Sequence, residues 1–235
     1  MKKCLIISMV VALVLTGCLM GSYARTQWDL LLVQPAIDGI LKIRTIATGE
    51  YDIDQSGAAV PLGEGYILAL THCTNPDKVL LRTMFGTFNV ENKVESVEYT
   101  VNGKEAVLVG RKGDLSLFRC PYFMDPYSIP WGDSDDIRPG DRILSIGTTY
   151  GLPPLLADGI IAAVGFIPPE GADGLYENRF LFYPNPGPGD SGTPIISVDS
   201  WGKYRVVGIT DQLIGKLGSA IKSNYILETV ESLKV

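Results

Sequence analysis

A short glycine-rich segment holds the serine best suited to chemistry. Residues 187–194 read Gly-Pro-Gly-Asp-Ser-Gly-Thr-Pro. A serine between glycines in a tight turn presents its hydroxyl and leaves backbone N–H groups directed at one point, which is what an oxyanion hole requires. The competing interpretation is a surface turn with a solvated serine, since turns favour the same residue types. Ser191 is thus a candidate nucleophile for acyl transfer.

His72 is the single histidine of the 235-residue chain. A serine hydroxyl is a weak nucleophile at its ordinary pKa and needs a nearby base that takes its proton near neutral pH, for which histidine is suited. If a histidine activates Ser191, that histidine is therefore His72. A lone histidine is more often a packed or exposed residue without a catalytic role. Its position in Ala69-Leu70-Thr71-His72-Cys73, at the end of an expected strand, favours catalysis.

Asp114 is the best candidate for a third, orienting residue. A carboxylate that orients an imidazole is expected among apolar residues at the edge of a strand, and Asp114 directly precedes the apolar run 115–118. The alternative is a turn residue that begins a strand. The order His, Asp, Ser is that of chymotrypsin, whereas α/β-hydrolases place Ser first and subtilisins place Asp first. The other acidic residues weighed lie in turn-rich polar sequence: Asp133, Asp135, Asp136 and Asp141.

The sequence that must position these residues is typical of an all-β fold, with short apolar or alternating runs between Gly, Pro, Asn and Asp. A helical period occurs only near the end, where Ile226, Val230 and Leu233 follow a cap candidate at Ser223-Asn224. Prolines in residues 121–139 predict a connection between two β halves, since proline cannot donate to a sheet ladder. Expected strands include residues 41–47, 65–70, 79–84, 106–109, 115–118, 142–146, 159–167 and 205–210.

The first residues predict export. Lys2 and Lys3 precede an apolar run too short to favour a membrane span, as in a signal peptide. Residues 15–18, Leu-Thr-Gly-Cys, resemble the lipobox of bacterial lipoproteins, in which the cysteine is lipidated and the chain is cut just before it. This predicts a signal peptide at 1–17, a lipid anchor at Cys18 and a linker at 18–34. Two alternatives remain, an uncleaved signal anchor and ordinary cleavage after residues 22–24 with soluble secretion.

Composition excludes one class of partner. The net charge is −6, and it becomes more negative once Lys2 and Lys3 are removed. An acidic chain without a Lys/Arg cluster has no electrostatic footprint for nucleic acid, so we expect no nucleic-acid partner.

Many short motifs in order resemble trypsin-type serine proteases, in particular the HtrA/Deg branch. Gly63–Leu68 with Thr71-His72 resembles the branch's first-barrel strand and histidine turn, and residues 114–117 resemble its Asp-Leu-Ala-Leu. Residues 185–192 resemble the nucleophile loop, and residues 218–224 the entry to the last helix. The resemblance implies two packed six-stranded antiparallel β-barrels with a short C-terminal helix. The implied boundaries are a protease domain at 35–235, barrels at about 40–120 and 140–221, and a helix at about 223–234.

The resemblance also implies roles for individual residues. Ser191 would be acylated, His72 would be general base and then general acid, and Asp114 would orient the imidazole. The N–H groups of Gly189 and Ser191 would form the oxyanion hole. Substrates would be proteins or peptides, and neither cofactor nor metal is implied. Residues implied to pair with a substrate strand or line the specificity pocket are Thr210, Asp211, Gln212, Leu213, Leu217 and Ser219.

Some features depart from the family pattern. Thr193 replaces the usual second glycine after the serine, and the loop before the serine carries prolines at 186 and 188 and is longer than the branch's usual form. Asp190 matches trypsins, although the chain shows no evident activation site. The chain continues only about forty residues past the serine, too few for the PDZ domain usual in HtrA proteins. Beside endopeptidase function we therefore consider an inactive or trigger-dependent binding protein, and an esterase-like hydrolase.

Two cysteines, Cys73 and Cys120, belong to the expected folded domain. An oxidising compartment would allow them to pair. If the strand before His72 is antiparallel to the strand after Asp114, as in chymotrypsin-like barrels, the two cysteines lie at opposite ends of the pair. We therefore expect two buried thiols that pack as small hydrophobic groups.

Overall fold

The computed structural model describes residues 34–83, 86–148, 155–165, 177–198 and 203–234. The chain divides into two units, residues 1–38 and residues 39–235. Residues 34–38 of the first unit are helical. The predicted signal peptide, Cys18 and the linker up to residue 33 lie outside the described residues. Within the described part of the chain, no helix is long and apolar enough to cross a membrane.

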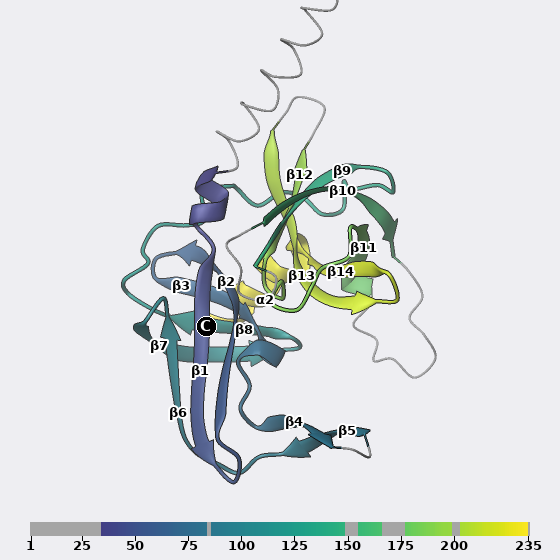
Figure 1. The fold of residues 1–235 in the computed structure, drawn as a ribbon. Coiled ribbons are helices and arrows are strands. Elements are labelled where there is room, and N and C mark those ends of the chain that lie inside the picture. The colour runs from purple at the N-terminus through teal and green to yellow at the C-terminus, as the bar shows by residue number, and fades with distance from the viewer. Residues whose placement is uncertain (1–33, 84–85, 149–154, 166–176, 199–202, 235) are drawn as a thin grey trace, which may run out of the picture. The chain divides into compact units, whose positions relative to one another are not determined.

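The second unit contains two closed antiparallel barrels of six strands each, as predicted (Figure 1). The first closes in the order β1-β2-β3-β8-β7-β6 and the second in the order β10-β11-β14-β13-β12-β9. The first-barrel strands are β1 Leu41–Gly49, β2 Ile53–Gly63, β3 Tyr66–Leu70, β6 Val94–Val101, β7 Lys104–Lys112 and β8 Leu115–Arg119. The second-barrel strands are β9 Arg142–Gly147, β10 Leu155–Val164, β11 Arg179–Tyr183, β12 Pro194–Val198, β13 Tyr204–Ile214 and β14 Leu217–Lys222.

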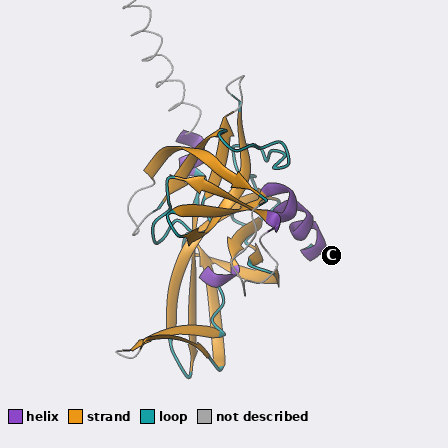
Figure 2. Cartoon of the chain, turned by 90° about the vertical axis from the view of Figure 1, so that its right-hand side faces the viewer, coloured by secondary structure: helices purple, strands orange, loops and turns teal. Residues whose placement is uncertain are grey.

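Three further elements complete the described structure. A 3-10 turn, η1 (Thr71–Cys73), follows β3, and a hairpin of β4 (Lys78–Thr83) and β5 (Gly86–Glu91) forms a separate two-stranded sheet. The C-terminal helix α2 (Ser223–Leu233) is the longest helix of the described residues, among which strands predominate (Figure 2).

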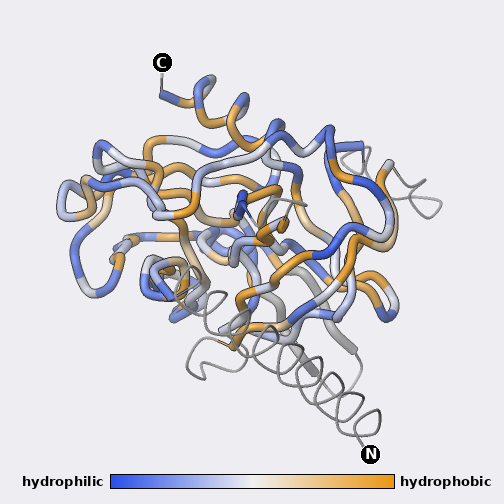
Figure 3. The backbone as a smooth tube through the Cα atoms, turned by 90° about the horizontal axis from the view of Figure 1, so that it is seen from above, coloured by the Kyte–Doolittle hydropathy of each residue, from blue (hydrophilic) through white to orange (hydrophobic). Residues whose placement is uncertain are grey.

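Each barrel closes around its own apolar core. Along β1, Leu41, Ile43, Thr45 and Ala47 are buried, whereas Lys42 and other intervening residues are more exposed, as the period of two of a strand requires. Hydrophobic and hydrophilic stretches follow one another along the described backbone (Figure 3). The first core is formed by Leu41, Ile43, Ala59, Ile67, Ala69, Tyr99, Val101, Ala106, Phe118 and Cys120. The second core is formed by Ile137, Ile143, Ile161, Phe180, Phe182, Ile195, Val207 and Ala220.

The cysteine prediction is confirmed, because Cys73 and Cys120 are both buried and unbridged. Strands β3 and β8 are antiparallel, with Leu70 opposite Leu115 and Tyr66 opposite Arg119. Cys73 follows the end of β3 and Cys120 follows the end of β8. The two thiols therefore lie at opposite ends of the strand pair.

Helix α2 begins differently from the predicted cap. Lys222 occupies the N-cap without a side-chain cap hydrogen bond, so the prediction of a Ser223-Asn224 cap is wrong. The Ser223 hydroxyl instead donates to the carbonyl of Gly132 at 2.7 Å. The Asn224 amide donates to Asp133 at 2.7 Å and to Asp135 at 3.1 Å. These polar side chains fasten the helix to the segment between the barrels instead of satisfying its own first turn.

We expect Asn224→Ala to lower the free energy of unfolding by about 1–2 kcal/mol, because the segment near Asp133 loses its hydrogen bonds to the helix. Urea denaturation followed by tryptophan fluorescence measures this. Glu228→Ala, an exposed position on the same helix, is the control and should leave the midpoint unchanged. Equal midpoints for Asn224→Ala and the parent protein would contradict the assignment.

Candidate active site

His72 and Asp114 meet because two paired strands of the first barrel end side by side. Leu70, the last residue of β3, pairs with Leu115, the first residue of β8. The residues just beyond this pair are joined by a backbone hydrogen bond in which Thr71 N–H donates to the Asp114 carbonyl at 2.9 Å. The His72 backbone N–H donates to Asp114 Oδ1 at 3.0 Å, and His72 Nδ1 lies 2.8 Å from Asp114 Oδ2.

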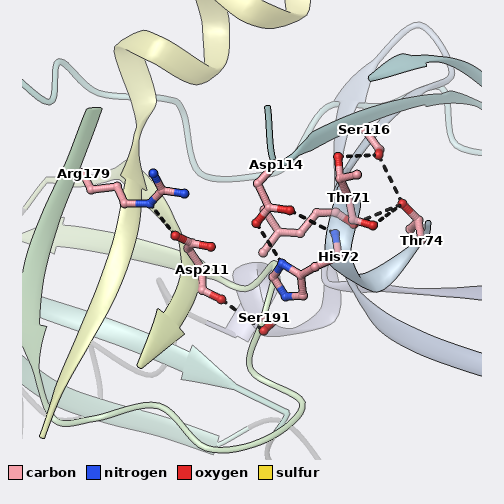
Figure 4. A network of polar contacts seen from close by, with 9 residues as sticks. Thr71, His72, Thr74, Asp114, Ser116, Arg179, Ser191 and Asp211 are labelled. Atoms are coloured by element: carbon pink, nitrogen blue, oxygen red, sulfur yellow. Dashed lines mark hydrogen bonds and ion pairs between the residues drawn. The ribbon is translucent and has the colours of Figure 1, made fainter. Parts of the chain in front are cut away.

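This double contact fixes the orientation of the imidazole. An ionised carboxylate only accepts hydrogen bonds, so Nδ1 carries the proton and donates it to Asp114. In the neutral ring Nε2 is then left as the acceptor. Figure 4 shows the ring lying between the Asp114 carboxylate and the Ser191 hydroxyl.

Three hydroxyl groups tie the histidine turn to β8. Thr71 Oγ1 lies 3.0 Å from Ser116 Oγ, and Thr74 Oγ1 lies 3.1 Å from the same atom (Figure 4). Thr74 Oγ1 also lies 3.1 Å from the carbonyl oxygen of Leu70. Ser116 and Thr74 are fully buried, so these bonds are shielded from water and hold the turn rigidly.

The pair also shifts the pKa of both members. Burial lowers the pKa of His72, but the hydrogen bond to Asp114, the neighbouring Cys73 thiol and the charge of Asp114 together raise it above its ordinary value. Burial raises the pKa of Asp114, but the hydrogen bond and charge of His72 bring it below its ordinary value. The His72 side chain is 44% exposed and that of Asp114 is 18% exposed. The imidazole is thus reachable while its partner is mostly covered.

Ser191 lies in a turn held between the barrels. Its carbonyl accepts a hydrogen bond from the backbone N–H of Ala58, in β2 of the first barrel, at 3.2 Å. The next residue, Gly192, donates to the carbonyl of Thr210 in β13 at 2.8 Å. Gly192 has a φ of +90°, and a Cβ there would lie 2.3 Å from the Ala58 carbonyl oxygen. Only glycine allows the two barrels to approach so closely at this point.

Asp190 and Thr193 brace the same turn from inside. The carboxylate of buried Asp190 accepts from the Gly187 backbone N–H at 2.7 Å. The Thr193 hydroxyl donates to the Asp190 carbonyl at 2.6 Å and lies fully buried. The threonine that replaces the family's glycine therefore closes the serine turn by a hydrogen bond.

The backbone before Ser191 presents two uncommitted donors. Gly189 has a φ of +101°, and its carbonyl accepts from the Thr148 hydroxyl at 2.6 Å. Asp190 N–H donates to the Gly187 carbonyl. Among the described residues, none accepts a hydrogen bond from the N–H of Gly189 or of Ser191. Such a pair of free amides can bind a developing oxyanion.

The Ser191 hydroxyl donates to the backbone carbonyl of Asp211 at 3.3 Å (Figure 4). A cavity of about 230 Å³ adjoins this hydroxyl. Described residues that line the cavity are Pro186, Gly187, Pro188, Ser191, Thr210, Asp211 and Leu213.

The other residues predicted for substrate binding are placed in different ways. Gln212 and Leu213 are exposed at the end of β13, whereas Thr210 and Asp211 are buried. Leu217 is half-buried and Ser219 is fully buried in β14, and neither is among the described residues that line the cavity.

A family model described as a trypsin-like peptidase domain matches residues 55–209, a span that contains His72, Asp114 and Ser191. The chain belongs to this family.

Two relatives, both described as probable periplasmic serine endoproteases, match most of this chain. A probable periplasmic serine endoprotease, DegP-like, from Rickettsia conorii is 25% identical over 210 residues, 86% of this chain and 39% of the relative. One from Marinomonas sp. is 30% identical over 200 residues, 79% of this chain and 38% of the relative. The chain thus spans about two fifths of the length of these relatives.

Solved structures agree with the two-barrel fold. The HtrA-type protease AlgW with a tripeptide matches with a TM-score of 0.61 and 25% identity, over 86% of this chain and 62% of that one. A serine endoprotease from Yersinia pestis matches with a TM-score of 0.58 and 21% identity, over 86% of this chain and 65% of that one. The second likeness concerns the fold alone.

One member of this trypsin-like site was not predicted from the sequence. Arg179, at the start of β11, donates from Nε to Asp211 Oδ2, and the two side chains are 8% and 3% exposed (Figure 4). An arginine directly before the apolar residues Phe180 to Phe182 was the available signal, since a buried charge requires a partner.

The Asp211 carboxyl also lies beside His72 and Asp114, and one polar atom of each residue lies within 4.8 Å of the other two. Two carboxylates and an imidazole are groups that also bind metal ions. Here the Arg179 guanidinium already neutralises Asp211, so we interpret the group as a hydrogen-bonded charge cluster. The expectation that no metal is required stays a prediction.

We expect Asp114→Asn to lower the pKa of His72 by about 1–3 units, because the imidazolium loses its hydrogen bond to a carboxylate. A pH titration followed by NMR measures this without ambiguity, since His72 is the single histidine. Asp54→Asn, which breaks the exposed pair with Arg44, is the control and should not move the signal. An unchanged His72 titration in Asp114→Asn would refute the coupling.

Proposed function

We propose that this chain is a serine endopeptidase that uses Ser191, His72 and Asp114. The observation that carries the proposal is the hydrogen bond of the single imidazole to Asp114, with its free side toward Ser191. His72 takes the hydroxyl proton on Nε2 as Ser191 Oγ bonds to the scissile carbonyl carbon. Asp114 stabilises the imidazolium that forms.

The rest of the cycle follows from the same groups. The N–H groups of Gly189 and Ser191 stabilise the oxyanion as the carbonyl double bond opens. His72 then gives its proton to the leaving amine as the peptide C–N bond breaks, which leaves an acyl-enzyme. Water, deprotonated by His72, attacks the acyl carbon, and Ser191 recovers the proton when the ester bond breaks. No co-reactant besides water is needed.

We propose that the outer end of β13 aligns the substrate. Leu213 lines the cavity beside Ser191, and Gln212 and Leu213 carry exposed side chains at the end of β13, where an extended peptide can pair with the strand. The HtrA-type protease AlgW was solved with a tripeptide, which supports peptides as the substrate class.

The hydroxyl contact favours a second candidate, a protease-fold binding protein that is inactive or needs a trigger. Ser191 Oγ donates to the Asp211 carbonyl, and its proton must turn toward His72 before it can be transferred. This 3.3 Å contact is long for an O–H···O hydrogen bond, whose usual length is about 2.7–2.8 Å, so we give priority to the enzyme.

A fluorophosphonate probe tests the choice, since it is captured only by an activated serine. We expect the parent protein to be labelled and Ser191→Ala to be unlabelled. His72→Ala should lower the labelling rate by about three orders of magnitude or more. Ser197→Ala, a serine of β12 outside the site, should label like the parent. A folded parent protein that does not react would reject the peptidase and favour the binding protein.

We further propose that the chain acts in the cell envelope, on a lipid anchor at Cys18. Relatives described as periplasmic support export. The residues Leu-Thr-Gly-Cys at 15–18 support the anchor, because they resemble a lipobox. Two or more acyl chains hold a protein stably on a bilayer.

Cys18→Ser should move the protein from the detergent-extracted membrane fraction to the soluble fraction, because the acylated sulfur is removed. Fractionation with an antibody against the chain measures this. Cys4→Ser, within the predicted signal peptide, is the matched control and should stay with the membrane. Retention of Cys18→Ser in the membrane would favour a signal anchor.

A further inference from the structure

Asp211 lies at the centre of the polar groups of the site. Its carboxylate accepts from Arg179, its carboxyl lies within 4.8 Å of that of Asp114, and its carbonyl accepts from Ser191. We propose that Asp211, held by Arg179, is a positioning residue for the His72–Asp114 pair, an inference that rests on the proposed function.

Strand geometry explains how the side chain reaches this place. In the pairing of β13 with β14, Thr210 faces Ala220 and Gln212 faces Ser219, and Asp211 has no partner between them. This is a β-bulge, which bends a strand and redirects a side chain. Thr210 and Asp211 are both buried at the bulge, as are residues 206–209 before it.

Arg179 holds the Asp211 carboxyl from strand β11, which is separated from β13 by β14. The two ionised groups are almost wholly buried, and each would be costly without the other. Arg179 and Asp211 belong to the second barrel, whereas His72 and Asp114 belong to the first. The carboxyl–carboxyl contact therefore links the serine-bearing barrel directly to the histidine-bearing barrel.

The contact also distributes charge in favour of Asp114. Two adjacent carboxyl groups resist joint ionisation, so one of them holds the proton more tightly. Burial and the hydrogen bond and charge of Asp114 raise the pKa of Asp211 to about 6, against the lowering effect of Arg179. The same hydrogen bond contributes to the lowered pKa of Asp114. Asp114 thus stays ionised as the pH falls, because Asp211 takes the proton first.

Above that pH Asp211 adds negative charge near the imidazole. The groups that face the pair are Arg179 from β11, Asp114 from the turn before β8, and His72 with the Cys73 thiol from η1. Their formal charges run from the positive Arg179 through the two negative carboxylates to the positive imidazolium. Removing the charge of Asp211 should therefore make His72 easier to deprotonate.

The test is the near-isosteric Asp211→Asn, whose amide donates to Asp114 but cannot ionise. We expect the NMR pKa of His72 to fall by about one unit. The acid limb of the kcat/KM profile on a peptide substrate should move to lower pH by the same amount. The plateau should fall by about threefold to tenfold, since a weaker base accepts the serine proton less readily.

Two further variants separate positioning from folding. Asp211→Asn combined with Arg179→Gln removes both buried charges, so that no guanidinium is left unpaired, and should show the same shift of the His72 pKa. Asp158→Asn breaks the exposed pair with Arg142 in the same barrel and should shift neither the pKa nor the profile.

A lowered melting temperature with an unchanged His72 pKa and pH profile would overturn the proposal and make the pair purely structural. The NMR titration needs no turnover. A parent protein that fails to react with the fluorophosphonate probe would reject the peptidase, while the His72 pKa would still decide whether Asp211 acts on the pair.

Discussion

The site depends on the contact between strand β2 and the serine turn. Residues of that turn bond to both barrels, to Ala58 in the first and to Thr210 in the second. His72 and Asp114 are fixed to the first barrel by backbone as well as side-chain bonds. The distance between serine and imidazole is therefore set by how closely the barrels approach. Gly192 permits that approach, since any side chain there would meet the Ala58 carbonyl.

A second constraint is electrostatic. A buried arginine, two carboxyl groups and an imidazole lie in sequence across the junction, so each charge has an opposite neighbour. Removing Arg179 or Asp211 leaves the other uncompensated in a place that water reaches poorly. The junction is thus held by hydrogen bonds at the backbone and by charge at the side chains. This explains how two barrels with separate cores can keep a shared site in register.

The sequence predicted most of the architecture because regular alternation is local. β1, β3, β8 and β9 stand out as apolar or alternating runs, and α2 stands out by its helical period. β2 was missed because its apolar and polar residues do not alternate and because Gly57 and Pro61 interrupt it. The strand forms through its pairing with β1 on one side and β3 on the other. β6 was missed because charged residues occupy some of its exposed positions, and only residues near its end are buried.

The same logic applies to the site. That His72, Asp114 and Ser191 would lie together was predictable because the proposed chemistry restricts each role to few residue types, and the chain has one histidine. The start of α2 was not predictable, because the side chains of Ser223 and Asn224 form hydrogen bonds to residues about ninety positions away in the chain. Capping rules describe only contacts within a few residues of the helix end.

Asp211 shows most clearly what a pattern cannot supply. The sequence placed it in a strand edge with Thr210, Gln212 and Leu213, and alternation would send consecutive residues to opposite faces. The bulge breaks that alternation, and it depends on the register with β14, which no local pattern specifies. At the bulge the buried part of β13, which ends at Asp211 beside Asp114, gives way to an exposed part beside the cavity. One strand thereby serves the charge cluster and the proposed substrate edge together, because the register with β14 shifts between Thr210 and Gln212.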